Sequence, residues 1–291
     1  MSLELCVLAS GSAGNCSVLR TRSGALLIDA GLGPRATGRR LLGTGVDLSE
    51  LRAILLTHPD TDHFNPTWFP AARHYKVPIY CATNHVPTLR RLAARRGFRP
   101  LKPLLVAFKS SPFQPLPGLT CHPLRLAHDR RGSQAFLLDT GRHRLGYATD
   151  FGHVPPDLID LFTGVDLLAI ESNYDPRMEL ASNRPWSLKQ RIMGRAGHLS
   201  NPDALSAVRA ILDETGRRLG PNHRPHHIVL LHRSRHCNCP VLLRRLFTQD
   251  QRIAPILTLA HQDERTEWLG LPGRAPLVGE QLCLFHGENS A

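Results

Sequence analysis

The sequence predicts an α/β fold in which helices cover mixed β-sheets. Two observations carry this prediction: short apolar or β-branched runs recur along the chain, and segments with helical patterns lie between them. The strand-like runs cluster early and in the middle of the chain, with the helical segments interleaved. This order is typical of sheets that bury their faces against helices.

The expected elements follow from these patterns in chain order. Strands are predicted at residues 5–9, 25–29, 53–57, 78–81, 135–139, 145–149, 167–171 and 228–231. Helices are predicted at residues 35–42, 86–96, 155–161, 187–195, 202–214 and 240–247. Asn201 is expected to cap the fifth of these helices, with Pro202 as its first helical residue. The proline-rich residues 100–117 are predicted to be a loop, and residues 273–291 a weakly ordered C-terminal tail.

The composition is that of an ordinary soluble globular protein. Of its 291 residues, 42% are hydrophobic and 21% are charged, and the length allows one large domain or two small ones. No run approaches the roughly 20 apolar residues of a membrane span, and the N-terminus lacks the regions of a secretory signal. The seven cysteines are irregularly spaced and odd in number, which favours free thiols. We therefore expect a cytoplasmic protein with no membrane partner; the oligomeric state stays open.

The charge balance favours a polyanionic partner. The chain carries 36 Lys and Arg against 24 Asp and Glu, a formal net charge of +12. Such an excess is expected for proteins that bind phosphate-rich molecules such as nucleic acid. A basic composition bias of the source organism explains the same number equally well.

Several apolar strand runs end in a residue that can bind a metal ion. These residues are Asp29, His58, His128, Asp150, Glu171 and His232. A buried strand delivers its last side chain to the edge of the sheet, where loops form a cleft. One histidine in such a place is more often a hydrogen-bonded, half-buried residue than a ligand. The repetition of the pattern favours a shared metal site.

The segment from 58 to 63 supplies further ligands in one turn. In an extended loop, residues i and i+2 point the same way, so His58 and Asp60 can share one ion. Asp62 and His63 would then face a second ion. His128 would complete the first site and His232 the second, and the two oxygens of Asp150 could bridge both ions. Two ions roughly 3.5–4 Å apart lower the pKa of a bridging water and clamp a transferring phosphoryl group.

These residues resemble the signature of the metallo-β-lactamase fold, which is His-x-His-x-Asp-His followed by a distant histidine, aspartate and histidine. Here Asp60 stands where that signature has its second histidine. The YycJ/WalJ-like branch is resembled most, through "LASGSAGNCSVL" (8–19), "LLIDAG" (26–31), "TDFG" (149–152), "IESNYD" (170–175), "PWSLKQRIMGRAGHLSNPDA" (185–204) and "LLHRSRHCNCP" (230–240). The resemblance covers roughly residues 3–265, nearly the whole chain.

The resemblance implies a four-layer αββα sandwich over residues 1–272, with two divalent ions, Zn²⁺ or Mn²⁺, at one edge between the sheets. It implies exonuclease-type hydrolysis of DNA: a bridging hydroxide attacks phosphorus, Asp62 orients it, and His198 protonates the leaving oxygen. His198 could instead cap the helix that starts near Asn201. No inserted second domain of the kind found in the larger β-CASP nucleases is visible, so core loops must build any substrate groove.

Four further residues are expected beside the metals. Asp29 is expected to orient a ligand histidine through a hydrogen bond rather than to bind metal. Ser10, Ser12 and Asn15 lie in a loop of small residues. That loop could hold a phosphate through its backbone N–H groups, or it could be a tight turn between two strands.

Three functions share this set of residues. The first is a binuclear metal-dependent phosphodiesterase acting as a nuclease. The second is a small-molecule hydrolase that cleaves a cyclic phosphate, a lactone or a thioester, which would not need a surface of charge +12. The third is a degenerate member that binds nucleic acid without catalysis, and Asp60 is its main support. A carboxylate at this position hardens the first site, so we expect a preference shifted from Zn²⁺ toward Mn²⁺.

Overall fold

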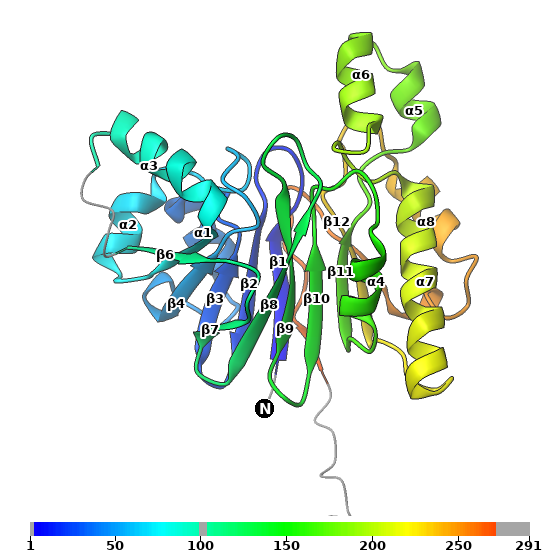
Figure 1. Ribbon diagram of the computed structural model, residues 1–291, viewed down its shortest axis with the longest axis horizontal. Coiled ribbons are helices and arrows are strands. Elements are labelled where there is room, and N and C mark those ends of the chain that lie inside the picture. The colour runs from blue at the N-terminus through cyan, green and yellow to red at the C-terminus, as the bar shows by residue number, and fades with distance from the viewer. Residues whose placement is uncertain (1–2, 99–103, 272–291) are drawn as a thin grey trace, which may run out of the picture.

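Two seven-stranded sheets face each other between two layers of helices (Figure 1). The computed structural model describes residues 3–98 and 104–271. In this part of the chain the first sheet has the order β14-β1-β2-β3-β4-β5-β6, and the second has the order β13-β12-β11-β10-β9-β8-β7. The predicted αββα sandwich is therefore confirmed. The tail expected at 273–291 lies outside the described residues.

The first sheet and its helices come mainly from the N-terminal half of the chain. They are β1 (Leu3–Ala9), β2 (Cys16–Thr21), β3 (Gly24–Ile28), α1 (Pro34–Leu41), β4 (Leu51–Leu55), α2 (Trp68–His74), β5 (Ile79–Ala82), α3 (Val86–Arg95), β6 (Leu105–Phe108) and, from the far end, β14 (Leu269–Gly270). Short 3₁₀ turns occupy Leu48–Glu50 and Thr83–His85.

The second sheet and its helices follow. They are β7 (Phe113–Leu116), β8 (Leu119–Leu126), β9 (Ser133–Asp139), β10 (Arg144–Ala148), α4 (Pro156–Phe162), β11 (Leu167–Glu171), α5 (Pro176–Ala181), α6 (Trp186–Met193), α7 (Asn201–Leu219), β12 (His227–Leu231), α8 (Pro240–Phe247) and β13 (Leu257–Leu259). A third 3₁₀ turn occupies Ala254–Ile256. Helices α5 and α6 project from the body of the molecule (Figure 1).

Three apolar cores hold the four layers together. The core between the sheets contains Leu5 and Phe136, the core under α1–α3 contains Trp68, and the core under α4, α7 and α8 contains Val208 and Phe247. Because both faces of most strands are buried, their sequences are continuous apolar runs rather than alternating ones. This is why the strands could be found from the sequence.

The prediction of a loop over 100–117 was wrong for the part that the structure describes, which begins at residue 104. Strand β6 pairs in parallel with β5, and β7 pairs with β8. Both are short strands at the edges of their sheets, where Pro115 is tolerated because an edge strand need not donate every N–H group. The rings of Phe108 and Phe113 stack with their centroids 4.7 Å apart, which fastens the two edges to each other.

The predicted start of α7 was also displaced by one residue. The N-cap is Ser200, whose hydroxyl accepts a hydrogen bond from the backbone N–H of Asp203 at 3.2 Å. Asn201 is the first helical residue and Pro202 the second. The short helices α2 and α5, of 7 and 6 residues, were not predicted.

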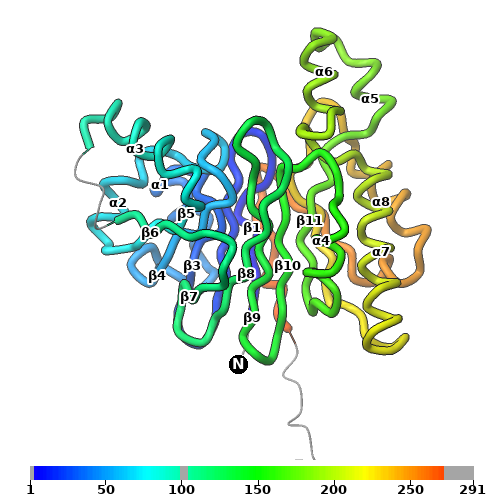
Figure 2. The backbone as a smooth tube through the Cα atoms, in the orientation of Figure 1, coloured from blue at the N-terminus to red at the C-terminus, as the bar shows by residue number. Residues whose placement is uncertain are grey.

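The topology gathers the carboxyl ends of the strands at one edge of the sandwich. β3 and β4 are parallel, and so are β10, β11 and β12. β8 runs in the direction of β10, since both are antiparallel to β9. The smooth trace in Figure 2 shows these strands side by side between the helical layers. Within the described residues, no helix combines the length and the apolarity that crossing a membrane requires.

Candidate metal centre

The residues expected as metal ligands lie together at this edge. Their nitrogen and oxygen atoms form groups whose members lie within 4.8 Å of one another: His58, Asp60 and His128; His58, His63 and Asp150; Asp62, His63 and His232; and Asp150, Glu171, His198 and His232. The first and third groups are those that the sequence assigns to separate ions, and Asp150 lies between them. All seven expected ligands are thus brought together.

The turn that carries four of these residues is anchored to the chain after β3. The N–H of His63 donates to the carbonyl of Asp60, which closes the turn at 2.9 Å. The N–H of Ala30 donates to the carbonyl of His63 at 2.7 Å, and that of Asn15 to the carbonyl of Asp62 at 2.6 Å. Because these bonds are between backbone atoms, the turn is fixed before any ion binds.

Each histidine expected as a ligand is oriented through its Nδ1 atom. The partners are the Thr57 hydroxyl for His58 (3.0 Å), the Asp29 carboxylate for His63 (2.7 Å), the Gly197 carbonyl for His128 (3.0 Å) and the Glu171 carboxylate for His232 (2.9 Å). A carbonyl or a carboxylate at Nδ1 fixes the ring and directs Nε2 into the cluster. Asp29 therefore lies where the sequence places it, beside a ligand ring rather than among the ions.

The Nε2 atoms of His232 and His58 fit a divalent cation. Nε2 of His232 is buried and makes no hydrogen bond with any described residue, although it lies 3.4 Å from a carboxylate oxygen of Asp62. Buried ring nitrogens are nearly always paired, so an unpaired one beside a carboxylate indicates a missing partner. Nε2 of His58 lies 3.8 Å from Asp60, whose side chain is 52% exposed. Imidazole nitrogens mixed with carboxylate oxygens suit Zn²⁺ and Mn²⁺.

Three residues of the centre adopt a backbone conformation that side chains other than glycine rarely take. The φ angles of Asp29, Asp150 and His232 are 59°, 57° and 53°. Each lies within two residues of a strand end, and the left-handed turn there directs its side chain into the cluster. Such strain costs of order 1–3 kcal/mol per residue and persists only where the surrounding structure holds the residue in place, as it often does at functional sites.

The carboxylates and histidines of the centre shift one another's pKa toward the charged forms. Burial by itself would lower the pKa of His63, but the carboxylates of Asp150 and Asp29 outweigh it and raise this pKa well above its usual value. His232 behaves alike: burial is outweighed by Asp150 and its other acidic neighbours, and its pKa rises to about 10. For Asp150, burial is opposed by His232 and His63, which hold the pKa of the carboxyl well below its usual range. A divalent cation would supply the same positive charge in place of protons.

His198 points at the same cluster. Its Nδ1 atom lies 2.9 Å from Oε1 of Glu171 and 3.4 Å from Oδ1 of Asp150, and its side chain is 22% exposed. Burial by itself would lower the pKa of His198, but the Glu171 carboxylate outweighs it and raises the pKa. Ser200, not His198, caps α7, so the alternative reading of His198 as the helix cap is wrong.

Glu171 has a larger part in the centre than the sequence indicated. It is fully buried, and Oε1 accepts hydrogen bonds from both His198 and His232 at 2.9 Å. Oε2 accepts from the backbone N–H groups of Phe151 and Leu199 at 3.0 and 3.3 Å. Its place at a strand end marked it as a candidate ligand, but nothing in the sequence showed that it joins two histidines.

The loop of small residues after β1 supports the ligand histidines. The hydroxyl of Ser10 accepts the backbone N–H of His232 at 2.7 Å, and the side-chain amide of Asn15 lies 2.9 Å from Nε2 of His63. Asn15 also accepts the N–H of Gly11 at 2.8 Å, as in a tight turn. Ser12 is exposed and lines the cavity above the cluster.

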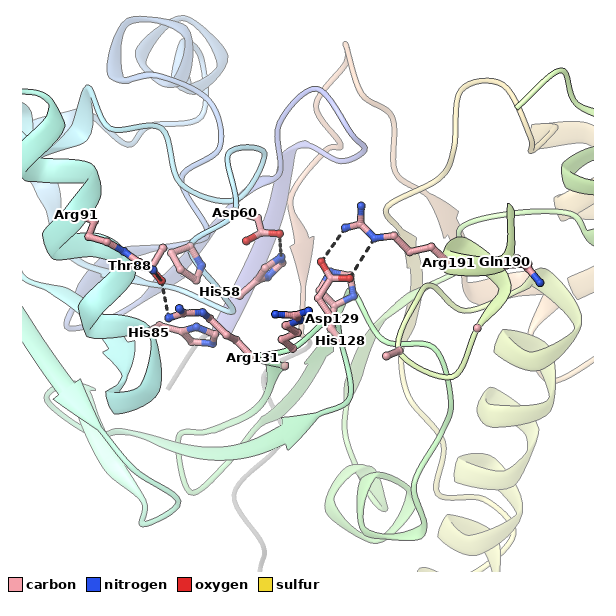
Figure 3. Close-up of a pocket in the computed structure, with 15 residues that line it drawn as sticks. His58, Asp60, His85, Thr88, Arg91, His128, Asp129, Arg131, Gln190 and Arg191 are labelled. Atoms are coloured by element: carbon pink, nitrogen blue, oxygen red, sulfur yellow. Dashed lines mark hydrogen bonds and ion pairs between the residues drawn. The ribbon is translucent and has the colours of Figure 1, made fainter. Parts of the chain in front are cut away.

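Two cavities open onto the cluster. One, of about 280 Å³, lies directly over it and is also lined by Arg184 and Arg191. The second, of about 660 Å³, shares His58, Asp60 and His128 with the cluster and extends toward α3 (Figure 3). Nothing in the sequence distinguishes Arg184, in the loop between α5 and α6, or Arg191, on α6, from the many other arginines of the chain.

The chain resembles known proteins along most of its length. Residues 25–223 match the beta-lactamase superfamily domain. Exodeoxyribonuclease YycJ of Bacillus anthracis is 29% identical over 250 residues, which cover 86% of this chain and 89% of that protein. Exodeoxyribonuclease WalJ of Streptococcus pneumoniae is 27% identical over 223 residues, 75% of this chain and 80% of that protein.

Among solved structures, the metallo-beta-lactamase fold protein YhfI from Bacillus subtilis superimposes with a TM-score of 0.65. The match covers 91% of this chain and 99% of that chain at 18% identity. At this level of identity the likeness demonstrates a shared fold.

Replacement of Gly31 by alanine should displace the turn at 58–63, which carries four of the candidate ligands. An added Cβ atom would lie 1.8 Å from the carbonyl oxygen of Asp62 and 2.7 Å from the backbone nitrogen of Asn15, and neither can move freely. We expect Gly31→Ala to lower the free energy of unfolding by roughly 1–3 kcal/mol and to lower the bound metal per chain. Urea denaturation and elemental analysis measure both.

Gly216→Ala is the matched control, because a Cβ atom there meets nothing within 4 Å inside helix α7. It should leave metal content unchanged and raise stability by up to about 1 kcal/mol. Full metal binding and unchanged stability in Gly31→Ala would contradict the anchoring of the turn.

Proposed function

This chain belongs to the beta-lactamase superfamily, and we propose that it is a binuclear metal-dependent phosphodiesterase that acts as an exonuclease, with DNA as the favoured substrate. The observation that carries the proposal is the meeting of two ligand groups at Asp150. Its Oδ2 atom lies 3.0 Å from Nε2 of His63, in one group, and its Oδ1 atom lies 3.9 Å from Nε2 of His128, in the other. One carboxylate thus faces both candidate ion positions.

We assign His58, Asp60 and His128 to one ion, Asp62, His63 and His232 to the other, and Asp150 to both. Zn²⁺ or Mn²⁺ ions bound there would act as Lewis acids on the phosphoryl oxygens and lower the pKa of water. Asp62 is 24% exposed in the cavity, with a free face toward solvent, so its carboxylate can accept a hydrogen bond from the attacking water and orient it.

His198 is the proposed donor of a proton to the leaving oxygen. Its Nδ1 atom is held by Glu171, so the other ring nitrogen remains for the cavity that it lines. Although burial opposes it, the Glu171 carboxylate beside Nδ1 raises the pKa of His198, and a histidine held in this way can serve as a general acid. Glu171 is the positioning residue for this ring and for His232.

Nucleic acid as the substrate is supported by three observations. The curated relatives are named exodeoxyribonucleases, the chain has a net charge of +12, and the larger cavity is lined by several arginines. The proposed location is the cytoplasm. The described cysteines, Cys6, Cys16, Cys81, Cys121, Cys237 and Cys239, are all free thiols, which suits a reducing compartment.

End-labelled single- and double-stranded DNA and RNA, incubated with Mn²⁺ or Zn²⁺ beside bis-p-nitrophenyl phosphate, test this function. We expect stepwise degradation of nucleic acid, with DNA favoured over RNA. Nuclease activity should fall steeply as salt rises from about 50 to about 200 mM, because binding of a polyanion weakens with salt. Hydrolysis of the small ester should respond only weakly to salt. Asp150→Asn should abolish both activities.

Two outcomes would contradict the proposal. Cleavage of the small ester without processing of any nucleic acid would indicate a small-molecule hydrolase. Fewer than about one bound ion per chain after reconstitution would indicate a degenerate member, because the catalytic scheme requires a metal clamp.

His198→Ala should discriminate between leaving groups. A nucleoside alkoxide needs a proton as it departs, whereas p-nitrophenolate is stable without one. We therefore expect kcat to fall roughly 10²–10⁴-fold on DNA and far less on bis-p-nitrophenyl phosphate. His153→Ala is the control, because His153 is half-buried away from the metal cluster and bonds only the carbonyl of Arg195 among the described residues. Equal losses on both substrates would refute the assignment.

Asp60→His should move metal preference toward Zn²⁺. The substitution restores an imidazole beside His58 and His128 and removes one negative charge, which softens the site. Protein dialysed against equal concentrations of Zn²⁺ and Mn²⁺ should gain Zn²⁺ at the expense of Mn²⁺ by elemental analysis. Asp60→Asn keeps an oxygen ligand but removes the negative charge. It therefore separates the effect of the lost charge from the effect of the added imidazole. An unchanged metal ratio in Asp60→His would count against Asp60 as a ligand.

A further inference from the structure

We propose that the 660 Å³ cavity beside the metal centre is a phosphate subsite, which holds a second phosphate of the substrate next to the one at the metals. This inference rests on the proposed function. The cavity lies between α3, residues 128–132 and α6, and shares His58, Asp60 and His128 with the metal cluster (Figure 3). A polynucleotide bound at the metals can therefore continue into it without crossing protein.

Two arginines converge on one hydroxyl at the α3 side of the cavity. Arg131 donates to Oγ1 of Thr88 at 2.8 Å, and Arg91 donates to the same atom at 3.4 Å. Neither arginine forms an ion pair with a carboxylate in the part of the chain that the structure describes. Two neighbouring guanidinium groups without an acid repel each other, and a phosphate that accepts from both would relieve the repulsion.

The α6 side of the same cavity is electrically different. There Arg191 donates to both oxygens of Asp129, at 3.2 and 2.7 Å. This pair is already neutralised, so the arginines that remain for a ligand are Arg91 and Arg131 toward α3 and Arg130 in the loop between the two sides. Only Arg91 and Arg131 converge on one point, which favours the α3 end for the anion.

His85 supplies a third group at that end. Its side chain lines the cavity, yet the residue is 1% exposed, and neither ring nitrogen makes a hydrogen bond with a described residue. Burial, and then Arg131 and Arg125, lower the pKa of His85 to about 4, although the backbone of Gly132 opposes the shift. The ring is therefore neutral, with one N–H group to donate. The backbone of Gly132 lies near the ring without a well-formed hydrogen bond, so a phosphate oxygen in the cavity would be a better acceptor.

The subsite explains how the centre could prefer a polymer. A phosphodiester with a single phosphate occupies the metals alone, whereas a nucleic acid reaches Arg91 and Arg131 as well. The second phosphate could be an internal diester or a terminal phosphate of the strand. Both present the same oxygens to the arginines, so the experiment must distinguish them.

Arg91→Ala and Arg131→Ala test the subsite in the metal-loaded protein. We expect each to raise the KM for an oligonucleotide, relative to the KM for bis-p-nitrophenyl phosphate, about tenfold, and to reduce the salt slope by about one. Arg90→Ala is the matched control: it removes the same charge from the helix that carries Arg91, and Arg90 is exposed like Arg91 and Arg131 but does not line the cavity. It should leave both ratio and slope unchanged. Equal effects of all three variants would show general electrostatics and overturn the subsite.

A binding measurement separates this inference from the proposed function. Calorimetric titration of metal-free protein with thymidine dinucleotides, with and without a 5′-phosphate, needs no catalysis. Binding that weakens about tenfold in Arg131→Ala but not in Arg90→Ala supports the subsite even if the protein cleaves no nucleic acid. If binding requires the 5′-phosphate, the ligand of the subsite is a terminal phosphate. If the dinucleotide without a 5′-phosphate binds equally well, the ligand is the internal phosphate. Cleavage of DNA by the wild type with unaltered dinucleotide binding in Arg91→Ala and Arg131→Ala would overturn the subsite alone.

Discussion

The buried carboxylate of Asp150 is the group on which the rest of the centre depends. Burial opposes its charge, and the protein keeps it ionised with His63 on one side at 3.0 Å and His232 on the other at 3.2 Å. Those rings need counter-charges of their own, which Asp29 and Glu171 supply at 2.7 and 2.9 Å. The result is a row of alternating charges, and removing one member would leave its neighbours uncompensated, at a cost of about 3–5 kcal/mol.

This row also joins the two halves of the fold. Asp29 and His63 come from loops of the first sheet, whereas Asp150, Glu171 and His232 follow strands of the second. The sheets are held together elsewhere by apolar packing, which is not directional. At the edge with the metal centre the contact is ionic and therefore demands fixed geometry. The left-handed backbone at three of these positions is the local strain that this geometry requires.

Much of the fold and of the ligand set could be predicted from the sequence, because buried strands have a simple pattern and their last residues share an edge. Strands β6 and β7 were not predicted because edge strands are short. Such strands need no continuous apolar run and can contain proline. Glu171 was noticed for its position, but its bonds to two histidines depend on a contact across 61 residues of chain. His85 and Arg131 gave no signal, since only the folded chain leaves one ring unpaired and one guanidinium without an acid.

The net charge of +12 means little until each arginine is located. Arg252 is paired with Asp250 and Asp213, and Arg218 with Glu214, so acidic residues of the protein itself neutralise these charges. A composition bias of the organism would scatter arginines without regard to the metal centre. Arginines that are paired with acidic residues far from that centre are what such a bias predicts. Arg91 and Arg131 differ, because they meet at one hydroxyl, lack carboxylate partners among the described residues, and line a cavity that contains metal-ligand candidates. Placement rather than number favours a polyanionic substrate, since a phosphate is attracted by the charge that remains locally uncompensated.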